Sequence, residues 1–264
     1  GKSLIVCTMM KRDTFPFLLL LMIQLSFQAG ALGIDSPFLP RPDTVPGVRI
    51  ERHFIIYEDA RFHSAFPSVV KRKNGELIVA FRRAPDRKIF GEKGTNHVDP
   101  NSYLVKVTSR DGVTWSKEPE LIYAHSFGGS QDPCLLQLRN GTILCTSYGW
   151  AFVRPDGIPN LKQPNFLIDS AVVFLGGYIL TSYDGAKTWE GPVYPPHITP
   201  EVNFSATGEP LAAYNRGALY EGKSGKIFWI VAASEVSPNK VTSNHLLVSE
   251  DKGKSWKYSS PVAV

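Results

Sequence analysis

The segment Ser182-Tyr183-Asp184-Gly185-Ala186-Lys187-Thr188-Trp189 decides the fold, because its pattern occurs three times in the chain. The pattern S-x-D-x-x-x-[ST]-W returns at 249–256 and, one residue shorter, at 109–115, with the aspartates 73 and 67 residues apart. A second signature, Asn-Gly or Ser-Gly followed by a short strand-like run, precedes each copy at 74–78, 140–144 and 224–228. Two motifs in constant order, three times over, indicate internal repeats.

Each repeat predicts four antiparallel strands. Asn-Gly between two apolar runs is a strong hairpin signal, because both residues tolerate a positive φ. A third strand ends at the Ser-x-Asp motif, and a short fourth strand follows the Trp. The predicted strands include 67–70, 77–81, 103–108, 121–123, 133–138, 143–148, 178–181 and 245–248. Four-stranded units of this length are typical of β-propeller blades, which bury their faces against neighbouring blades.

Composition supports an all-β fold and excludes several classes of protein. With 43% apolar and 20% charged residues, the 264-residue chain can form a core, and its 22 Gly and 20 Pro favour short strands and turns. The net charge of +5 falls to +3 beyond residue 31, which is too mild to indicate nucleic-acid binding. Three cysteines without a C-x-x-C spacing exclude a disulfide scaffold and a zinc site. We expect no metal and no cofactor.

Two of the cysteines flank the second Asn-Gly turn. Pairing Arg139 with Thr142 across that turn puts Leu136 opposite Cys145, with Cys134 as a diagonal neighbour on the same face. A disulfide is conceivable in a secreted protein, but this placement is poor for one and favours two buried thiols.

The N-terminus predicts secretion. Lys11 and Arg12 precede an apolar run at 15–27, and Ala29-Gly30-Ala31 reads as a cleavage site, so residues 1–31 are predicted to be a signal peptide, with 1–8 as a possible upstream extension. The alternative is an uncleaved membrane anchor, but the run is short for a span. No stable membrane span is expected after cleavage. Residues 32–47 form a Pro-rich spacer, and the folded part is predicted over 48–264.

The S-x-D-x-G-x-[ST]-W pattern resembles the Asp-box of sialidases (neuraminidases) and other BNR-repeat proteins. The resemblance covers about residues 60–260 and implies a six-bladed sialidase-like β-propeller, of which this chain holds about three blades. The chain is therefore expected to be incomplete, and the alternative is a half-propeller that closes by dimerisation.

The Asp-box residues are expected to be structural. The aspartates should accept hydrogen bonds from the backbone of their own turns, and the Trp side chains should pack beneath them. These residues are Ser109, Asp111, Trp115, Ser182, Asp184, Trp189, Ser249, Asp251 and Trp256.

Strand order places the candidate site at the end opposite the Asp-boxes. The loops at that end are longer and carry charged side chains, and arginine binds a carboxylate through two hydrogen bonds. We predict that this group binds an anionic sugar; its members are Arg61, Arg82, Arg83, Asp132 and Arg216. The resemblance implies an acid/base aspartate in the loop before the third strand, which is Asp99, with Asp86 as its competitor.

The sequence also departs from the family. The R-I-P sequence that opens strand 1 in sialidases falls at Ala65-Phe66-Pro67, so its arginine is missing. The later arginines and the tyrosine nucleophile of the family are not found in this chain, and Tyr148 is not assigned that role. The resemblance implies a secreted, periplasmic or extracellular exo-α-sialidase-like glycoside hydrolase, once completed by further blades, that acts on sialic acid or a related acidic sugar. The alternative is a non-catalytic Asp-box propeller that binds glycan or protein.

Overall fold

The computed structural model describes residues 4–12, 48–92, 97–168, 171–199, 201–215, 219–234 and 242–263. The chain forms two compact units, one of residues Val6–Ile55 and one of Gly1–Ile5 with Ile56–Val264. Apart from two short 3-10 helices, the regular structure within the described ranges consists of β-strands. The all-β class predicted from the sequence is therefore confirmed.

The smaller unit contains most of a two-stranded sheet of β1 (Leu4–Arg12) and β2 (Val48–Glu58). The apolar run at 15–27, the cleavage site and the spacer up to residue 47 lie outside the described residues, so the signal peptide stays a prediction. In the part of the chain that is described, no helix has the length and apolar character needed to cross a membrane.

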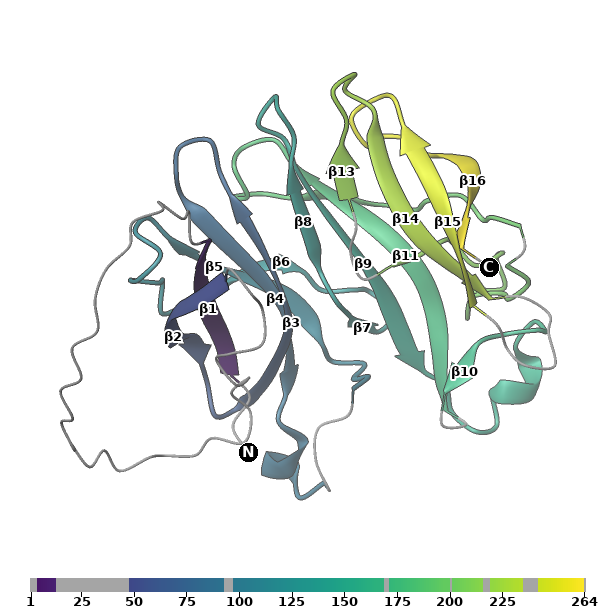
Figure 1. Cartoon of the computed structure of the whole chain (residues 1–264). Coiled ribbons are helices and arrows are strands. Elements are labelled where there is room, and N and C mark those ends of the chain that lie inside the picture. Colours follow the sequence, from purple (N-terminus) through teal and green to yellow (C-terminus); the bar gives the residue numbers. More distant parts are fainter. Residues whose placement is uncertain are drawn as a thin grey trace, which may run out of the picture. The chain divides into compact units, whose positions relative to one another are not determined.

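The first sheet of the larger unit follows the predicted four-strand pattern. Its order is β3 (Phe62–Lys71), β4 (Leu77–Pro85), β5 (Tyr103–Ser109) and β6 (Glu120–Tyr123), all antiparallel. The loop between β4 and β5 includes the 3-10 helix η1 (Arg87–Phe90). Figure 1 labels these four strands.

The second sheet has the same four strands and two short additions. Strands β8 (Cys134–Gln137), β9 (Ile143–Phe152), β11 (Val172–Ser182) and β12 (Glu190–Val193) form the repeat. β7 (Gly129–Ser130) pairs with β9, and β10 (Leu167–Ile168) pairs with β11. The 3-10 helix η2 (Ile158–Asn160) lies in the β9–β10 connection.

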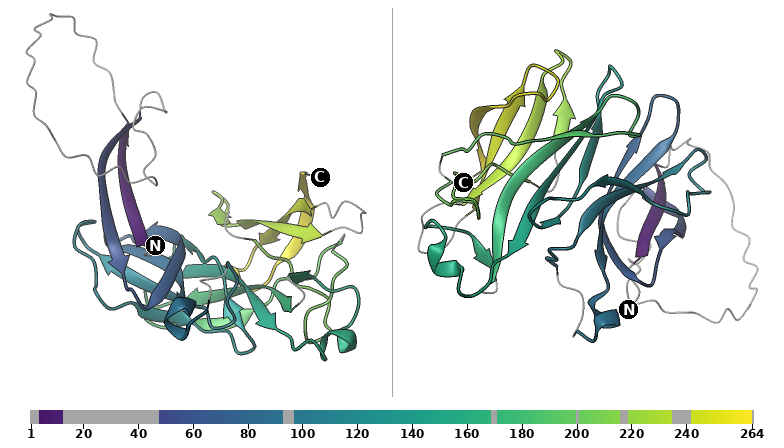
Figure 2. Two further views of the ribbon diagram at one scale, coloured as in Figure 1. Left: turned by 90° about the horizontal axis from the view of Figure 1, so that it is seen from below. Right: turned by 180° about the vertical axis from the view of Figure 1, so that it is seen from behind.

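The third sheet repeats the order with β13 (Leu219–Glu221), β14 (Ile227–Ser234), β15 (Thr242–Ser249) and β16 (Lys257–Ala263). Figure 2 shows the three sheets following one another along the chain in two further views.

The predicted register of the second hairpin is wrong by one residue. Leu135, not Leu136, pairs with Cys145, and Cys134 pairs with Thr146. The reason is the loop length: the backbone N–H of Leu138 donates to the carbonyl of Thr142, which leaves a three-residue loop ending in Gly141 at φ 96°. Both cysteines are thiols, and burial raises the pKa of Cys145.

Each face of the second sheet is buried against a neighbour. Ile143 and Leu180 pack with Ile78 and Leu104 of the first sheet. The adjacent residues Leu144 and Ile179 point the other way and pack with Trp229 and Leu247 of the third sheet, among others. Successive side chains in a strand alternate between faces, so a sheet buried on both sides needs this nearly continuous apolar sequence.

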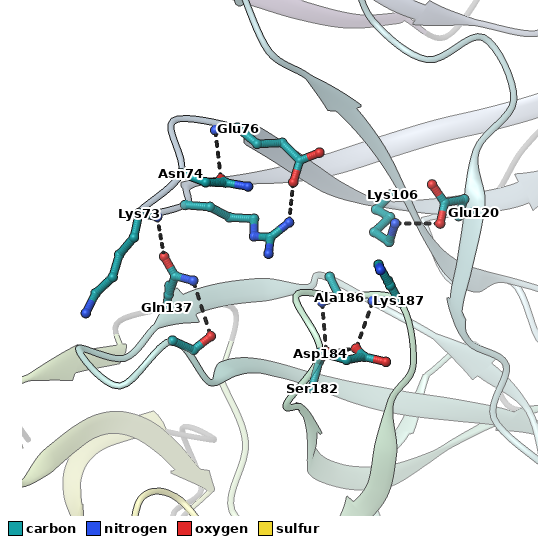
Figure 3. A network of polar contacts seen from close by, with 12 residues as sticks. Lys73, Asn74, Glu76, Lys106, Glu120, Gln137, Ser182, Asp184, Ala186 and Lys187 are labelled. Carbon is teal, nitrogen blue, oxygen red and sulfur yellow. Dashed lines mark hydrogen bonds and ion pairs between the residues drawn. The ribbon is translucent and has the colours of Figure 1, made fainter.

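The three Ser-x-Asp turns share one hydrogen-bond pattern. Asp111 Oδ1 accepts from the backbone N–H of Val113 and Thr114 at 2.8 and 2.7 Å, and from Ser109 Oγ at 3.0 Å. Asp184 and Asp251 accept equivalent bonds in their own turns, and Figure 3 shows Asp184 with Ser182, Ala186 and Lys187. The hydrogen bonds from Thr188 lower the pKa of Asp184. These carboxylates therefore hold their turns closed.

The three Trp side chains differ in depth. Trp256 is buried and meets Trp229 edge to face at 5.4 Å between ring centroids. Trp189 is half-buried against the core between the first two sheets, and Trp115 is also half-buried. The third repeat therefore comes nearest to the predicted packing beneath the turn.

The hairpin turns also connect neighbouring sheets. The backbone N–H of Lys73 donates to Gln137 Oε1 at 2.9 Å, as Figure 3 shows, and the backbone N–H of Arg139 donates to Glu221 Oε2 at 2.7 Å. Each turn thus holds the turn of the next sheet. At this end of the unit, the Ser-x-Asp motifs and the hairpin turns therefore stabilise the fold.

Gly253→Ala is expected to destabilise the protein by about 2 kcal/mol, since it combines left-handed strain with a clash in the core. Gly253 has φ 87°, and a Cβ there would lie 2.9 Å from Leu144 Cδ1. Gly141→Ala is the control, because Gly141 has φ 96° but nothing within 4 Å of an added Cβ, so strain alone should cost about 1 kcal/mol. Urea unfolding measures both variants; equal losses would contradict the packing of this turn on Leu144.

Candidate functional site

The candidate site lies where the loops opposite the Ser-x-Asp turns meet. Ser130 donates its backbone N–H to the carbonyl of Ser102 at 3.0 Å, and Gln131 Nε2 donates to the carbonyl of His97 at 2.8 Å. These bonds join the β4–β5 loop of the first sheet to the start of the second sheet. Loops held together on a rigid sheet scaffold can present side chains in fixed positions.

Arg82 is the most unusual side chain at this end. It lies near the end of β4, it is fully buried, and its Nε, Nη1 and Nη2 make no hydrogen bond with any residue that the structure describes. Burial lowers the pKa of Arg82 to about 10, although the nearby carboxylates of Asp99 and Asp132 oppose that shift. A buried cation without hydrogen bonds is costly unless another anion satisfies it. Arg82 therefore has five N–H donors available for a ligand.

The carboxylate of Asp132 interacts electrostatically with the Arg82 guanidinium. It also accepts a hydrogen bond from a tyrosine side chain. Tyr148 Oη donates to Asp132 Oδ2 at 3.0 Å, and both side chains are buried. Tyr148 was not among the predicted binding residues, yet the sequence contains a signal for it: Arg82 and Tyr148 each follow the turn asparagine of their hairpin by eight residues. They hold equivalent positions in neighbouring sheets.

Asp99 lies beside Arg82 but is already paired. Its carboxylate accepts from Arg87 Nε at 2.7 Å, from Arg87 Nη2 at 2.8 Å and from the backbone N–H of Asn101 at 2.8 Å. Burial raises the pKa of Asp99, but the hydrogen bonds from Arg87 and Asn101 outweigh it and lower the pKa overall. A general acid must hold a proton near its working pH. In this arrangement Asp99 is ionised and fixed by Arg87.

Asp99→Asn is expected to lower the free energy of unfolding at pH 7 by about 2 kcal/mol, because charge-assisted hydrogen bonds are lost. Since the folded-state pKa is depressed, the contribution of Asp99 is present above its unfolded pKa of about 3.9 and is lost as the pH falls through the lower folded value. The variant should therefore show a shallower loss of stability between about pH 5 and 2 in urea titrations. Arg87→Gln should also make that loss shallower, because without Arg87 the folded-state pKa of Asp99 rises toward its unfolded value. An unchanged acid profile in both variants would contradict the pairing.

Two other predicted binding residues belong to a separate group. Arg83 Nη2 and Arg61 Nη2 both bind Asp59 Oδ2 at 2.9 Å, and the Arg83 guanidinium lies 3.6 Å from the centroid of the Phe62 ring. Neighbouring residues of a strand point to opposite faces, so Arg83 is directed away from Arg82. Arg61 and Arg83 therefore pair with Asp59 rather than with the groups around Arg82, and their role in sugar binding stays a prediction. Arg216 lies outside the described residues.

Asp86, the competing candidate acid, caps η1. Its Oδ1 accepts from the backbone N–H of Lys88 at 3.1 Å. No cluster of three or more His, Cys, Asp or Glu side chains that could hold a metal ion occurs in the described ranges. The polar group at this end therefore comprises Arg82, Asp99, Asp132, Tyr148 and Arg87.

Ala65, the position at which the resemblance to sialidases implied an arginine, lies directly across from Arg82. Ala65 pairs with Arg82 in the β3–β4 register. Directly opposite residues of an antiparallel pair have Cβ atoms about 5 Å apart on the same face. Because the Ala65 side chain is small, it leaves space on that face of the sheet for the longer Arg82 side chain.

Several solved structures are similar to this chain. A protein of unknown function from Dyadobacter fermentans shares 68% sequence identity, with a TM-score of 0.80, over 83% of this chain and 60% of its own. The Hadza microbial sialidase Hz136 shares 15% identity, with a TM-score of 0.51, over 81% of this chain and 44% of its own. A family 117 glycoside hydrolase from Zobellia galactanivorans shares 17% identity, with a TM-score of 0.49, over 76% of this chain and 56% of its own.

No protein-family model matches the sequence, and neither does any curated protein. The chain spans about three fifths of the length of the Dyadobacter fermentans protein. At 15% identity the likeness to the sialidase is a likeness of fold. The chain has an all-β fold of antiparallel sheets similar to that of a sialidase.

Proposed function

We propose that this chain is part of a secreted, sialidase-like protein that binds the carboxylate of sialic acid or a related acidic sugar through Arg82 and, in its complete form, hydrolyses the glycoside. The three sheets would be three blades of a six-bladed Asp-box propeller. The protein would need no cofactor. The sialidase-like fold and the polar group at the loop end support this function.

The single observation that carries the proposal is the buried Arg82 guanidinium without hydrogen bonds within the described chain. A planar carboxylate matches a guanidinium with two parallel hydrogen bonds, and a sugar carboxylate would supply the missing partner. Arg82 also lies across from Ala65, where sialidases carry an arginine that this sequence lacks. We infer that Arg82 takes the place of that arginine from the neighbouring strand.

A second candidate is a non-catalytic glycan-binding propeller. The observation that favours it is the bidentate Arg87–Asp99 pair, since an ionised Asp99 cannot protonate a leaving group. For hydrolysis by Asp99, Arg87 would have to release the carboxylate when substrate binds. The Arg87–Asp99 pair as it stands supports binding of the sugar without turnover.

Calorimetric titration of the full chain with N-acetylneuraminic acid and with its methyl ester tests the binding proposal. The ester keeps every hydroxyl but loses the charge, so the acid should bind at least about tenfold more tightly. A titration with glucuronic acid tests whether the site binds a related acidic sugar instead of sialic acid. Equal affinity for the acid and the ester would overturn the proposal.

Turnover of a fluorogenic sialoside separates the two candidates. Release of the fluorophore above the rate with heat-denatured protein supports hydrolysis. Tight binding of the acid without any release supports the non-catalytic propeller instead.

A further inference from the structure

A cavity of about 340 Å³ lies at the loop end of the second sheet, and none of its lining residues belongs to the polar group around Arg82. Its walls come from β11, the segment after β6 and the connection from β12 to β13, which joins the second sheet to the third. The residues that bear on its chemistry are His125, Phe127, Tyr194, Ser205, Thr207 and Glu209. Its volume is in the range of small-molecule sites.

The wall nearest the sheet is fixed by the backbone. A bulge between Phe174 and Gly176 of β11 includes Leu175, which lines the cavity. Gly149 of β9 leaves room for this wall, because a Cβ there would lie 3.3 Å from both Leu175 Cδ1 and His125 Cδ2. A site whose wall stands on strands is better ordered than one built from loops alone.

Two aromatic side chains at the cavity are exposed. Phe127 is 70% exposed and Tyr194 is 54% exposed, although burying such rings is favourable. Both line the cavity, so a ligand with an apolar face would cover them. Exposed aromatic rings gathered at a cavity mark a binding surface more clearly than rings scattered singly.

The polar groups of the cavity are of mixed character. The Nδ1 atom of His125 accepts from the backbone N–H of Phe127 at 3.1 Å, so Nε2 carries the proton and is a donor. Burial lowers the pKa of His125 and keeps the ring neutral at pH 7. Ser205 Oγ and Thr207 Oγ1 lie 2.9 Å apart and add hydroxyl donors and acceptors. Of the described lining residues, Glu209 is the charged one and none is Lys or Arg.

We propose that this cavity binds a neutral pyranose sugar, with a face of the ring on Phe127 and Tyr194 and hydroxyl groups toward His125, Glu209 and Ser205. An acidic sugar would meet the Glu209 carboxylate without a Lys or Arg among the described lining residues to offset it. A purely aliphatic ligand would leave the polar lining groups without partners. A neutral sugar has both an apolar face and hydroxyl groups that donate and accept.

The cavity and the Arg82 group are separated by buried side chains. The His125 ring lies 5.7 Å from the ring of Tyr178, and Tyr178 Oη donates to Ser130 Oγ at 2.8 Å. Ser102 Oγ in turn donates to the carbonyls of Ser130 and Asp99. Arg82 is not a lining residue of the cavity, so it makes no direct contact with a sugar bound there.

Saturation-transfer NMR and calorimetry on the full chain test this inference, with methyl glycosides of glucose, galactose and mannose as probes. At least one probe should bind, and Phe127→Ala should raise its Kd about tenfold, because a stacking contact of about 1.4 kcal/mol is lost. Tyr183→Ala is the matched control, since Tyr183 is 56% exposed on the Ser182–Trp189 turn at the other end. It should leave the Kd unchanged. Arg82→Met should also leave it unchanged.

The Glu209→Gln variant and the probe benzylamine test whether the cavity binds amines instead of neutral sugars. The substitution keeps the shape of Glu209 and can still hydrogen-bond a hydroxyl, so glycoside affinity should fall no more than about threefold. Failure of all three glycosides to bind, or binding that Phe127→Ala leaves unchanged, would overturn the proposal. Benzylamine binding that Glu209→Gln abolishes, without glycoside binding, would assign the cavity to amines and overturn it as well.

Discussion

Arg82→Met is expected to weaken the binding of N-acetylneuraminic acid about 100-fold without lowering the melting temperature. The affinity should fall because two charge-assisted hydrogen bonds to the sugar carboxylate are lost. Stability should not fall, because the Arg82 guanidinium makes no hydrogen bond with any described residue and methionine fills a similar volume. Calorimetry and thermal unfolding of the same samples measure both effects.

Arg83→Met is the matched control at the next position of β4. Arg83 binds Asp59 and lies over the Phe62 ring, so its loss should cost about 2 kcal/mol of stability. Sugar affinity should be unchanged, because Arg83 points to the other face. If Arg82→Met lowers stability by the 3–5 kcal/mol typical of a broken buried pair, at about unchanged affinity, then Arg82 is a structural residue.

Trp256→Ala is expected to destabilise the protein by about 3–5 kcal/mol, the usual cost of removing a large buried aromatic side chain. Trp256 is 6% exposed, contacts the fully buried Trp229, and donates its indole N–H to the carbonyl of Gly253 at 3.2 Å. Urea unfolding measures the loss. Trp256→Phe, with a smaller loss of volume, provides a folded variant if the alanine variant does not fold.

Tyr220→Ala is the control for this substitution. Tyr220 is an aromatic residue of the same sheet that is 62% exposed, so its loss should cost less than about 1 kcal/mol. Acidic-sugar affinity should be unchanged in both variants while they are folded, since the Ser-x-Asp turns lie at the end opposite Arg82. A stable Trp256→Ala variant that loses sugar binding would contradict the structural role of this turn.

The strand order could be predicted because it rests on local chemistry. The turn glycines need a positive φ, and the Ser-x-Asp turns satisfy their own backbone N–H groups, so both leave clear signatures. The register of β8 and β9 could not be predicted as firmly. The same Asn140-Gly141 sequence suits a two-residue loop and the three-residue loop that the backbone adopts.

The candidate site could be predicted only in part. Strand alternation alone separates Arg82 from Arg83, so that division was available from the sequence. The pairing of Asp99 with Arg87 was not, because both residues lie between β4 and β5, where the sequence has no strand periodicity. Burial of Arg82 depends on loops that meet from two sheets, which no local pattern encodes.

The position of a bound acidic sugar tests the central claim most directly. In a crystal structure of the full chain soaked with N-acetylneuraminic acid, we expect both carboxylate oxygens within about 3 Å of the Arg82 guanidinium nitrogens, with the Arg87–Asp99 pair beside them. A sugar carboxylate bound to Arg61 or Arg83 instead, with Arg82 still without a ligand, would contradict the account.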